Sequence, residues 1–289
     1  MYKKESIRII SKGDRNYPPL LLEIPDPPEK LYCTGDVKLL GKPSLAVVGS
    51  RKCSEYGRRV AIKTGSEAAR NNLVVVSGMA KGIDSFGHLG ALNAGGKTIA
   101  VLGCGVDVCY PKENRKLYER IAAEGLIISE YPPGTEPAPY TFPQRNRIIS
   151  GLSAATVVVE AGTNSGALIT AEIAAAQGRE VFAVPGNITS QYSLGTNKLI
   201  ADGARPIAVI DDIFTAMGLT PAVSEALLEE LGADEQTVYS LIKENGEVSV
   251  DFICRMLDKT PVFVNGIVTV LEMKGLVAYN LGKIFVAKF

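Results

Sequence analysis

Residues 44–84 read SLAVVGSRKCSEYGRRVAIKTGSEAARNNLVVVSGMAKGID, and this stretch decides the fold. Two short apolar runs, Leu45–Val48 and Leu73–Val76, flank the stretch Tyr56–Arg70, in which apolar residues recur at helical spacing. A buried strand, a helix and a second buried strand form the repeating unit of a parallel sheet that is covered on both faces. Each apolar run ends in a glycine-containing loop, and such loops are where these sheets bind ligands.

The same alternation continues along the chain and predicts a doubly wound α/β fold. Further apolar runs are Thr98–Leu102, Leu126–Ile128, Thr156–Val159 and Glu180–Val184, and further helical stretches are Ile83–Ala94, Arg115–Ala123 and Ala167–Gln177. The predicted domains are a Pro-rich N-terminal strap over residues 1–40, an α/β domain over 41–217, a linker over 218–233 and a small domain over 234–289.

The small C-terminal domain has the pattern of a winged helix, which is three helices followed by a β-hairpin. The predicted elements are helices Asp234–Glu244, Val250–Leu257 and Val262–Met273 and strands Leu276–Asn280 and Lys283–Ala287, with Leu281-Gly282 as the hairpin tip. The segment 234–289 carries 6 Lys and Arg against 7 Asp and Glu, and its third helix is nearly uncharged. A helix that reads duplex DNA presents cations or amides to the groove, so we expect this domain to make protein contacts instead.

Composition excludes several classes of protein. With 46% hydrophobic residues among 289, the chain can bury a core, and no apolar run is long enough to span a membrane. The sequence begins without a signal-peptide pattern, and its five cysteines form no CxxC pair, so we expect a reduced, cytoplasmic protein without a metal site. The dinucleotide motif GxGxxG is missing, and we expect no cofactor. Net charge is zero, so binding of nucleic acid requires a local basic patch.

The loops after the predicted strands carry the candidate chemistry. Gly49-Ser50-Arg51-Lys52 and Ser77–Asp84 combine glycines, backbone amides and cations, which favours phosphate binding over glycine turns required by geometry alone. In the stretch 142–147, Phe142 precedes two arginines. This pattern suits either single-stranded nucleic acid or the start of a surface helix.

Two further residues are candidates for acid–base chemistry. Glu160 precedes a loop of small and hydroxyl residues, but no second catalytic group accompanies it in the sequence. His88, the single histidine, falls in a predicted helix between glycines, and we interpret it as a packed residue rather than a catalytic one.

These loops occur in an order that matches a known family. The matching pieces are Gly49-Ser50-Arg51, Ser77–Asp84, Gly103–Asp107, Tyr110-Pro111, Ser129–Pro132, Phe142-Pro143, Arg145–Leu152, Val159–Ala161, Ser165–Leu168, Ala183–Gly186 and Gly195–Ile200. They resemble the DNA-processing protein A family, also called DprA or Smf, over about residues 15–217.

The resemblance implies an extended Rossmann domain that binds single-stranded DNA and is not an enzyme. It also implies a homodimer that protects incoming DNA and loads RecA recombinase onto it during natural transformation or recombination. The family's DNA contacts correspond here to Arg51, Lys112, Phe142, Arg145 and Arg147, with Ser50, Lys81, Asn164 and Ser165 as neighbours.

Two other functions are weighed against this one. The first is a hydrolase, because the core also looks distantly like the nucleoside-monophosphate phosphoribohydrolases, whose PGGxGTxxE motif carries a catalytic glutamate. Here Gly162-Thr163 is followed by Asn164-Ser165-Gly166, so that acid is missing. The second is a transcription regulator that reads duplex DNA with the C-terminal domain, which the charge of that domain disfavours.

Overall fold

The computed structural model describes residues 7–219, 231–280 and 282–286. The chain divides into two compact units, Met1–Gly218 and Leu219–Phe289, and each has a hydrophobic core of its own. The predicted linker, 218–233, falls largely on residues 220–230, which lie outside the described residues.

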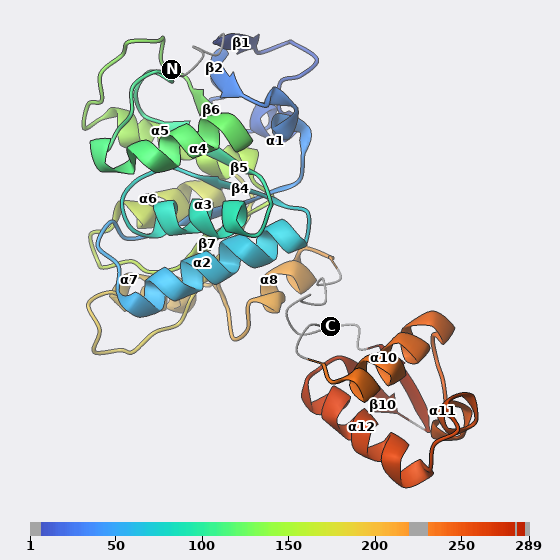
Figure 1. Ribbon diagram of the computed structural model, residues 1–289. Coiled ribbons are helices and arrows are strands. Elements are labelled where there is room, and N and C mark those ends of the chain that lie inside the picture. The colour runs from blue at the N-terminus through green and yellow to red at the C-terminus, as the bar shows by residue number, and fades with distance from the viewer. Residues whose placement is uncertain (1–6, 220–230, 281, 287–289) are drawn as a thin grey trace. The chain divides into compact units, whose positions relative to one another are not determined.

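The first unit is built on one large sheet with helices on both faces (Figure 1). In chain order its elements are β1 (Arg8–Ser11), α1 (Pro19–Leu22), β2 (Lys30–Gly35), the 3₁₀ helix η1 (Val37–Gly41), β3 (Ser44–Val48), α2 (Glu55–Arg70), β4 (Val74–Ser77), α3 (Ile83–Asn93), β5 (Thr98–Leu102), the 3₁₀ helix η2 (Lys112–Asn114), α4 (Arg115–Glu124), β6 (Leu126–Ser129), α5 (Thr141–Leu152), β7 (Ala155–Val158), α6 (Gly166–Ala176), β8 (Glu180–Ala183), α7 (Leu194–Ala201), β9 (Arg205–Pro206) and α8 (Asp211–Ala216).

The nine strands lie in the order β1-β2-β6-β5-β4-β3-β7-β8-β9. The seven strands from β3 to β9 run parallel, whereas β2 pairs antiparallel with β6 and β1 pairs antiparallel with β2. From β3 the chain winds first towards β6 and then, from β7 onwards, in the other direction. The predicted doubly wound α/β fold is confirmed, and its switch point lies between β3 and β7.

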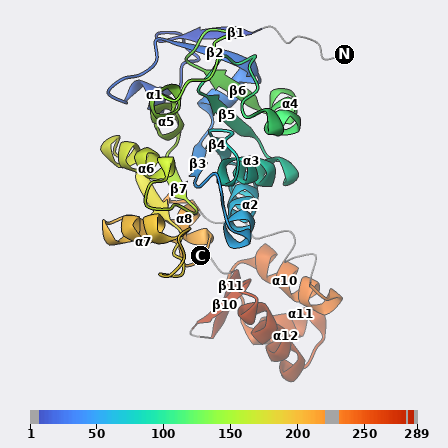
Figure 2. The same cartoon turned by 90° about the vertical axis from the view of Figure 1, so that its left-hand side faces the viewer.

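Alternate residues of each central strand face opposite helical layers, as β5 illustrates. Ile99 and Val101 belong to the core cluster that includes residues of α5 and α6, and Ala100 and Leu102 belong to the cluster that includes residues of α4. Figure 2 shows α5, α6 and α7 on one face of the sheet and α2, α3 and α4 on the other. Burial on both faces is the reason that these strands read as continuous apolar runs.

The first forty residues do more than lie on the domain as a strap. They add β1 and β2 to one edge of the sheet, and Leu21 and Leu31 are fully buried in its core. The hydroxyl of Tyr17 donates a hydrogen bond to the carbonyl of Pro28 at 2.7 Å. These strands escaped prediction because an edge strand such as β1 buries little more than Ile10 and so lacks a continuous apolar run.

In the second unit the described elements stand in the predicted order, three helices and then a β-hairpin, which is the arrangement of a winged helix. These elements are α10 (Ala233–Asn245), α11 (Val250–Leu257), α12 (Pro261–Met273), β10 (Val277–Asn280) and β11 (Lys283–Val286). Val264, Val268 and Leu271 of α12 pack in one core with Ile242 and Ile253 of the other two helices.

The two strands of this unit form an antiparallel hairpin in which Asn280 pairs with Lys283. Leu281, part of the predicted hairpin tip, and Ala287, the predicted end of the second strand, lie outside the described residues. Within the part of the chain that is described, no helix is both long and apolar enough to cross a bilayer.

Candidate functional site

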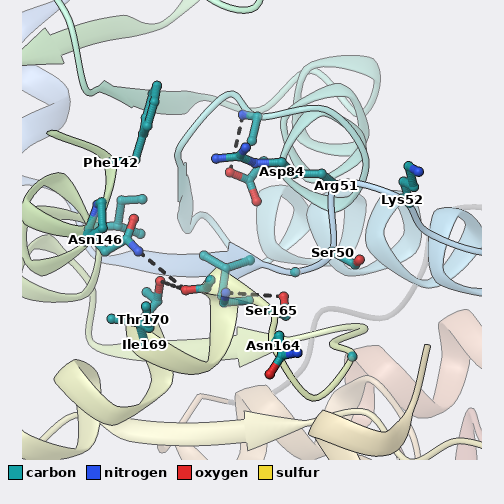
Figure 3. Close-up of a pocket in the computed structure, with 18 of the residues that line it drawn as sticks. Ser50, Arg51, Lys52, Asp84, Phe142, Asn146, Asn164, Ser165, Ile169 and Thr170 are labelled. Atoms are coloured by element: carbon teal, nitrogen blue, oxygen red, sulfur yellow. Dashed lines mark hydrogen bonds between the residues drawn. The ribbon is translucent and has the colours of Figure 1, made fainter. Parts of the chain in front are cut away.

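A pocket of about 880 Å³ opens at the carboxyl ends of the strands beside the switch point. Its walls are the loop after β3, the first turns of α5, and the loop that leads into α6 (Figure 3). The predicted site residues that line it are Ser50, Arg51, Phe142, Arg145, Asn164 and Ser165. Lys81, Lys112 and Arg147 do not line it.

Glu160, the candidate base, anchors the start of α2. Its carboxylate accepts hydrogen bonds from the Ser54 amide at 2.8 Å and from the Ser54 hydroxyl at 2.5 Å, and its own carbonyl accepts from the Ser50 amide at 2.7 Å. A side chain at Gly57 would collide with the carboxylate. Glu160 is 2% exposed, so this carboxylate joins the loops after β3 and β7 and is not presented to a substrate.

The two glycine loops pack against each other. Gly82 has φ +77°, and a Cβ there would collide with the Ser50 carbonyl, so only glycine fits. The next amide, of Ile83, donates to the same carbonyl at 3.2 Å. Lys81 therefore lies at the outside of this junction, where its Nζ pairs with Glu113 at 2.6 Å.

Arg145 forms part of the pocket floor and is only 5% exposed. Its Nη1 donates hydrogen bonds to the carbonyls of Gly78, at 2.7 Å, and Val101. Burial is the main cause that lowers its pKa, and Asp84 opposes that effect. Most of this guanidinium already binds the protein. Arg145 is therefore less available for the direct phosphate contact that the sequence predicts.

Asp84 is the buried counter-charge of Arg145. Its Oδ2 accepts hydrogen bonds from the amides of Gly78 at 3.1 Å and Ala80 at 3.4 Å. Burial raises the pKa of this carboxyl, and the Arg145 charge and the two amides counteract the rise. These two bonds fix the loop after β4 to the start of α3 beneath the pocket.

An aromatic pair stands beside the pocket. The rings of Tyr110 and Phe142 stack with centroids 5.4 Å apart and planes inclined by 28°. The Arg51 guanidinium carbon lies 5.6 Å from the centroid of the Phe142 ring, a cation–π contact. Phe142 is the second residue of α5, so the helix-start interpretation of this stretch is correct for the backbone, while the ring still faces the pocket.

The opposite wall is the N-terminus of α6. Ser165 is the N-cap, and its hydroxyl accepts a hydrogen bond from the Ala167 amide at 3.4 Å. Asn146 approaches from α5, and its Nδ2 donates to the Gly166 carbonyl at 3.5 Å (Figure 3). Asn164 is exposed beside the cap. Free amides and the helix dipole favour an anion at this position.

Arg147 and Lys112 lie outside the pocket in different environments. Arg147 is bound to two carboxylates, Glu130 at 2.7 Å and Asp26 at 3.1 Å, and its side chain is 16% exposed. It connects α5 to the N-terminal segment, so a phosphate would have to compete with both partners. Lys112 is exposed in η2, two residues beyond Tyr110.

His88 is packed in the interior, as interpreted from the sequence. The Thr98 hydroxyl donates to the Val75 carbonyl at 2.7 Å, so the Nδ1–H of His88 must be the donor to that hydroxyl at 2.6 Å. Its Nε2 has no partner among the described residues. Burial, with a smaller contribution from Arg145, lowers its pKa to about 3. The ring is neutral and inaccessible at neutral pH, so it cannot exchange protons with a ligand.

Several pocket residues were not named as DNA contacts in the sequence analysis, among them Lys52, Tyr110, Asn146 and Thr170. Lys52 had a usable signal, since it follows Arg51 directly. The position of Tyr110 depends on the path of the loop after β5, and residue order does not specify that path. In the described residues, no group of three or more His, Cys, Asp or Glu side chains is placed to hold a metal ion.

The fold and the pocket together define a Rossmann-like α/β protein with a candidate ligand site at the carboxyl ends of its parallel strands. The family model described as DNA recombination-mediator protein A matches residues 8–218, which include every strand of the large sheet. The chain belongs to this family, as the sequence resemblance predicted.

Relatives in several bacteria share most of the chain. It is 48% identical over 200 residues to the DNA processing protein DprA of Streptococcus pneumoniae, a match that covers 69% of this chain and 71% of the relative. It is 43% identical over 214 residues to DprA of Bacillus subtilis, covering 74% and 72% of the two chains. Protein Smf of Escherichia coli is 44% identical over 197 residues, covering 68% and 53%.

Two solved structures are similar in both fold and sequence. The X-ray structure of DprA from Streptococcus pneumoniae matches with a TM-score of 0.70 and 46% identity, covering 73% of this chain and 74% of that one. A structure of DNA processing protein A from Helicobacter pylori matches with a TM-score of 0.68 and 32% identity, covering 74% and 96%. The second is described as giving insights into that protein's single-stranded DNA binding mode.

Proposed function

We propose that this protein binds single-stranded DNA in the pocket at the carboxyl ends of its strands, without cutting it. The observation that carries the proposal is the exposed Arg51 beside the stacked rings of Phe142 and Tyr110, in a pocket whose other wall is a helix N-terminus. Aromatic faces stack on bases of any sequence, and cations and free amides bind phosphates. Membership of a recombination-mediator family supports the same conclusion.

In this proposal the exposed side chains contact the DNA, and the more buried ones mainly stabilise the walls of the pocket. Arg51 and Lys112 are exposed and neutralise phosphates, and Phe142 offers its ring to a base. The polar groups of Ser50, Asn164 and Ser165 bind the strand near the start of α6, and Lys81 adds charge at the edge of the site. Arg145 acts from the floor and Arg147 from outside the pocket, where both mainly stabilise the walls.

The absence of cutting is supported by the state of the candidate acid–base groups. Glu160 is bound to Ser54, and His88 is buried and neutral. Among the described residues, Asp84 is the one carboxylate that lines the pocket, and it is buried near Arg145. General acid–base catalysis needs a group within reach of the substrate, and these groups are held elsewhere.

The direct test measures binding of a labelled single-stranded oligonucleotide and of its duplex at two salt concentrations. We expect the single strand to bind more tightly, with log affinity falling against log salt by about 0.7 per phosphate contacted. Intact oligonucleotide should be recovered after the incubation. Equal or tighter binding of the duplex would contradict the proposal, and shortened oligonucleotide would contradict the non-catalytic part.

We further propose that the protein works as a homodimer in the cytoplasm, protects incoming DNA and loads RecA onto it. Two pockets in one assembly would hold two segments of a strand side by side, which suits delivery to a recombinase. The test is RecA filament formation on a single strand already covered by single-strand-binding protein, with and without this protein. No acceleration would overturn the loading role, and a monomer in sedimentation experiments would overturn the dimer.

The C-terminal unit is proposed to make protein contacts. The described surface of α12 exposes Val262 and Met273 at more than four-fifths of their area, and the helix contains no Lys or Arg. Duplex-reading helices present several cations or amides, and α12 offers one amide, that of Asn265. Deletion of the residues after 219 should leave the affinity for single strands unchanged, whereas loss of a gel shift on that deletion would assign DNA binding to this unit.

A further inference from the structure

We propose that the DNA-binding surface extends beyond the pocket along the exposed face of α2, through Tyr56, Arg59 and Lys63. This inference rests on the proposed binding of single-stranded DNA and adds a second stretch of contacts to it. The pocket supplies Arg51 and Lys52 at one of its edges, and α2 begins directly after them. A strand that leaves the pocket past Lys52 would meet these three side chains next.

The three residues form one stripe because of helical spacing. They stand at positions i, i+3 and i+7 of α2, so they share one face of the helix. Tyr56 is 46% exposed, and Arg59 and Lys63 are both exposed. The opposite face carries Ala61 and Ala68, which are fully buried. The stripe is therefore the outward side of a helix that is packed onto the sheet and α3.

The charges on α2 leave this stripe positive. Glu55 pairs with Arg58 at 2.7 Å, and Glu67 pairs with Arg70 at 2.6 Å, so each carboxylate has its own arginine within the helix. Arg59 and Lys63 form no salt bridge with any residue that the structure describes. The stripe thus carries two cations that no protein carboxylate binds directly.

The position of α2 relative to the pocket is fixed. The Ser54 N-cap is bound by the Glu160 carboxylate, which belongs to the other side of the switch point. In Figure 3, Lys52 lies on the side of the pocket away from Phe142. With a rise of about 1.5 Å per residue, Arg59 and Lys63 are about 6 Å apart along the helix axis, which suits neighbouring phosphates of an extended strand. An exposed tyrosine among cations adds a surface on which a base can stack.

The test compares a short oligonucleotide that fills only the pocket with a long one that also reaches the stripe. The variant is Arg59→Gln with Lys63→Gln. For the long oligonucleotide we expect the salt slope to fall by about 1.4 and the affinity at 0.1 M salt to fall roughly 25-fold, because two phosphate contacts are removed. For the short oligonucleotide both quantities should stay at the wild-type values.

A matched control is provided at the other end of the sheet. Lys38 and Lys42 are also exposed and four residues apart, but they precede β3 and so lie at the amino ends of the parallel strands. The variant Lys38→Gln with Lys42→Gln removes the same net charge and should leave both oligonucleotides unaffected. If this control variant loses as much affinity for the long oligonucleotide as the α2 variant does, only net charge matters, and the proposed contact with the α2 stripe is overturned.

The design separates failure of the stripe from failure of the proposed function. If the wild-type protein binds neither oligonucleotide, the pocket proposal fails and the stripe fails with it. If wild-type binds both and the α2 variant retains the full salt slope on the long one, the stripe alone is wrong. A melting temperature equal to wild-type verifies that the α2 variant is folded, as expected for two exposed side chains.

Discussion

The rim and the floor of the pocket use the same kinds of residue for different purposes. On the rim, Arg51 is exposed and its guanidinium lies against the face of the Phe142 ring. On the floor, Arg145 is 5% exposed, bound to two backbone carbonyls and subject to the charge of the buried Asp84 carboxyl. An arginine whose donors are already occupied in a low-dielectric interior stabilises the protein, whereas one left in solvent is available to a ligand. Exposure and bonding partners, rather than residue type, therefore distinguish an arginine that stabilises the protein from one that is available to a ligand.

The floor should be tested first, because it gives the largest effect. Replacing Arg145 by Met leaves two carbonyls without their donor and removes the positive charge that opposes the effect of burial on Asp84. We expect the free energy of unfolding in urea to fall by about 2–5 kcal/mol, because two buried carbonyls lose their donor and a buried carboxyl loses a nearby opposite charge. The double variant Arg145→Met with Asp84→Asn should recover part of this loss. If Arg145→Met unfolds at the same urea concentration as the wild-type protein, Arg145 does not stabilise the fold, and the distinction between the floor and rim arginines is wrong.

The pH dependence of stability tests the same interior through His88. In the folded protein burial lowers its pKa to about 3, while in the unfolded chain the pKa is near 6.5. Between these values only the unfolded chain binds the proton, so stability is complete above pH 6.5 and is lost as the pH falls. We expect the free energy of unfolding to fall by at most about 1.4 kcal/mol per pH unit.

The useful window for this measurement is pH 6.5 to 5, above the range of most carboxyl groups. His88 is the single histidine of the chain, so a His88→Leu variant removes the effect without ambiguity. Its unfolding free energy should be flat in that window while the wild-type value declines. Parallel curves for the two proteins would show that the histidine is not held neutral.

The aromatic pair sharpens the comparison on the rim. Phe142→Ala should weaken binding of single strands by about 1–3 kcal/mol, because a stacking surface is lost. Tyr110→Ala should also weaken binding, since its ring lies against Phe142, whereas Tyr110→Phe keeps the ring and should bind as wild-type does. Fluorescence anisotropy with a labelled oligonucleotide measures all three. Wild-type affinity in Phe142→Ala would remove the rings from the site.

The smallest effect distinguishes two single arginines. Arg51→Ala should lower the salt slope by about 0.7 and the affinity at 0.1 M salt roughly fivefold, as one lost phosphate contact requires. Arg147→Ala should leave the slope unchanged and lower only the thermal stability, since its charge is bound to Glu130 and Asp26. The opposite pattern would assign the DNA contact to the paired arginine.

The central fold was predictable because burial on both faces leaves a plain signal. The run Thr98–Leu102 is apolar apart from Thr98, is buried throughout and coincides with β5. Strands β1 and β2 were missed because β1 buries little apart from Ile10 and β2 alternates buried with partly exposed residues, so neither leaves a continuous apolar run. Helix α5 was left undecided because its first two turns contain Phe142, Pro143 and two arginines, whose burial depends on the tertiary structure.

The sequence predicted which loops form the site, but it did not predict which partners the side chains of those loops bind. The sequence placed cations and glycines at the ends of neighbouring strands, and the pocket lies there. It did not separate Arg145 from Arg51, because the carbonyls that bind Arg145 come from β5 and the loop after β4, far away in the chain. Tyr110 acquires its neighbour Phe142 in the same way, from a distant segment.

The bond between Glu160 and Ser54 has a consequence for the thermodynamics of binding. It fixes the two loops that flank the switch point before any ligand arrives, so the conformational entropy of ordering them is lost during folding rather than on association. A site organised in this way changes its backbone little when occupied. Most of the entropy cost of association should then fall on the flexible DNA strand, and the affinity should depend more on how stiff that strand is than on any rearrangement of the protein.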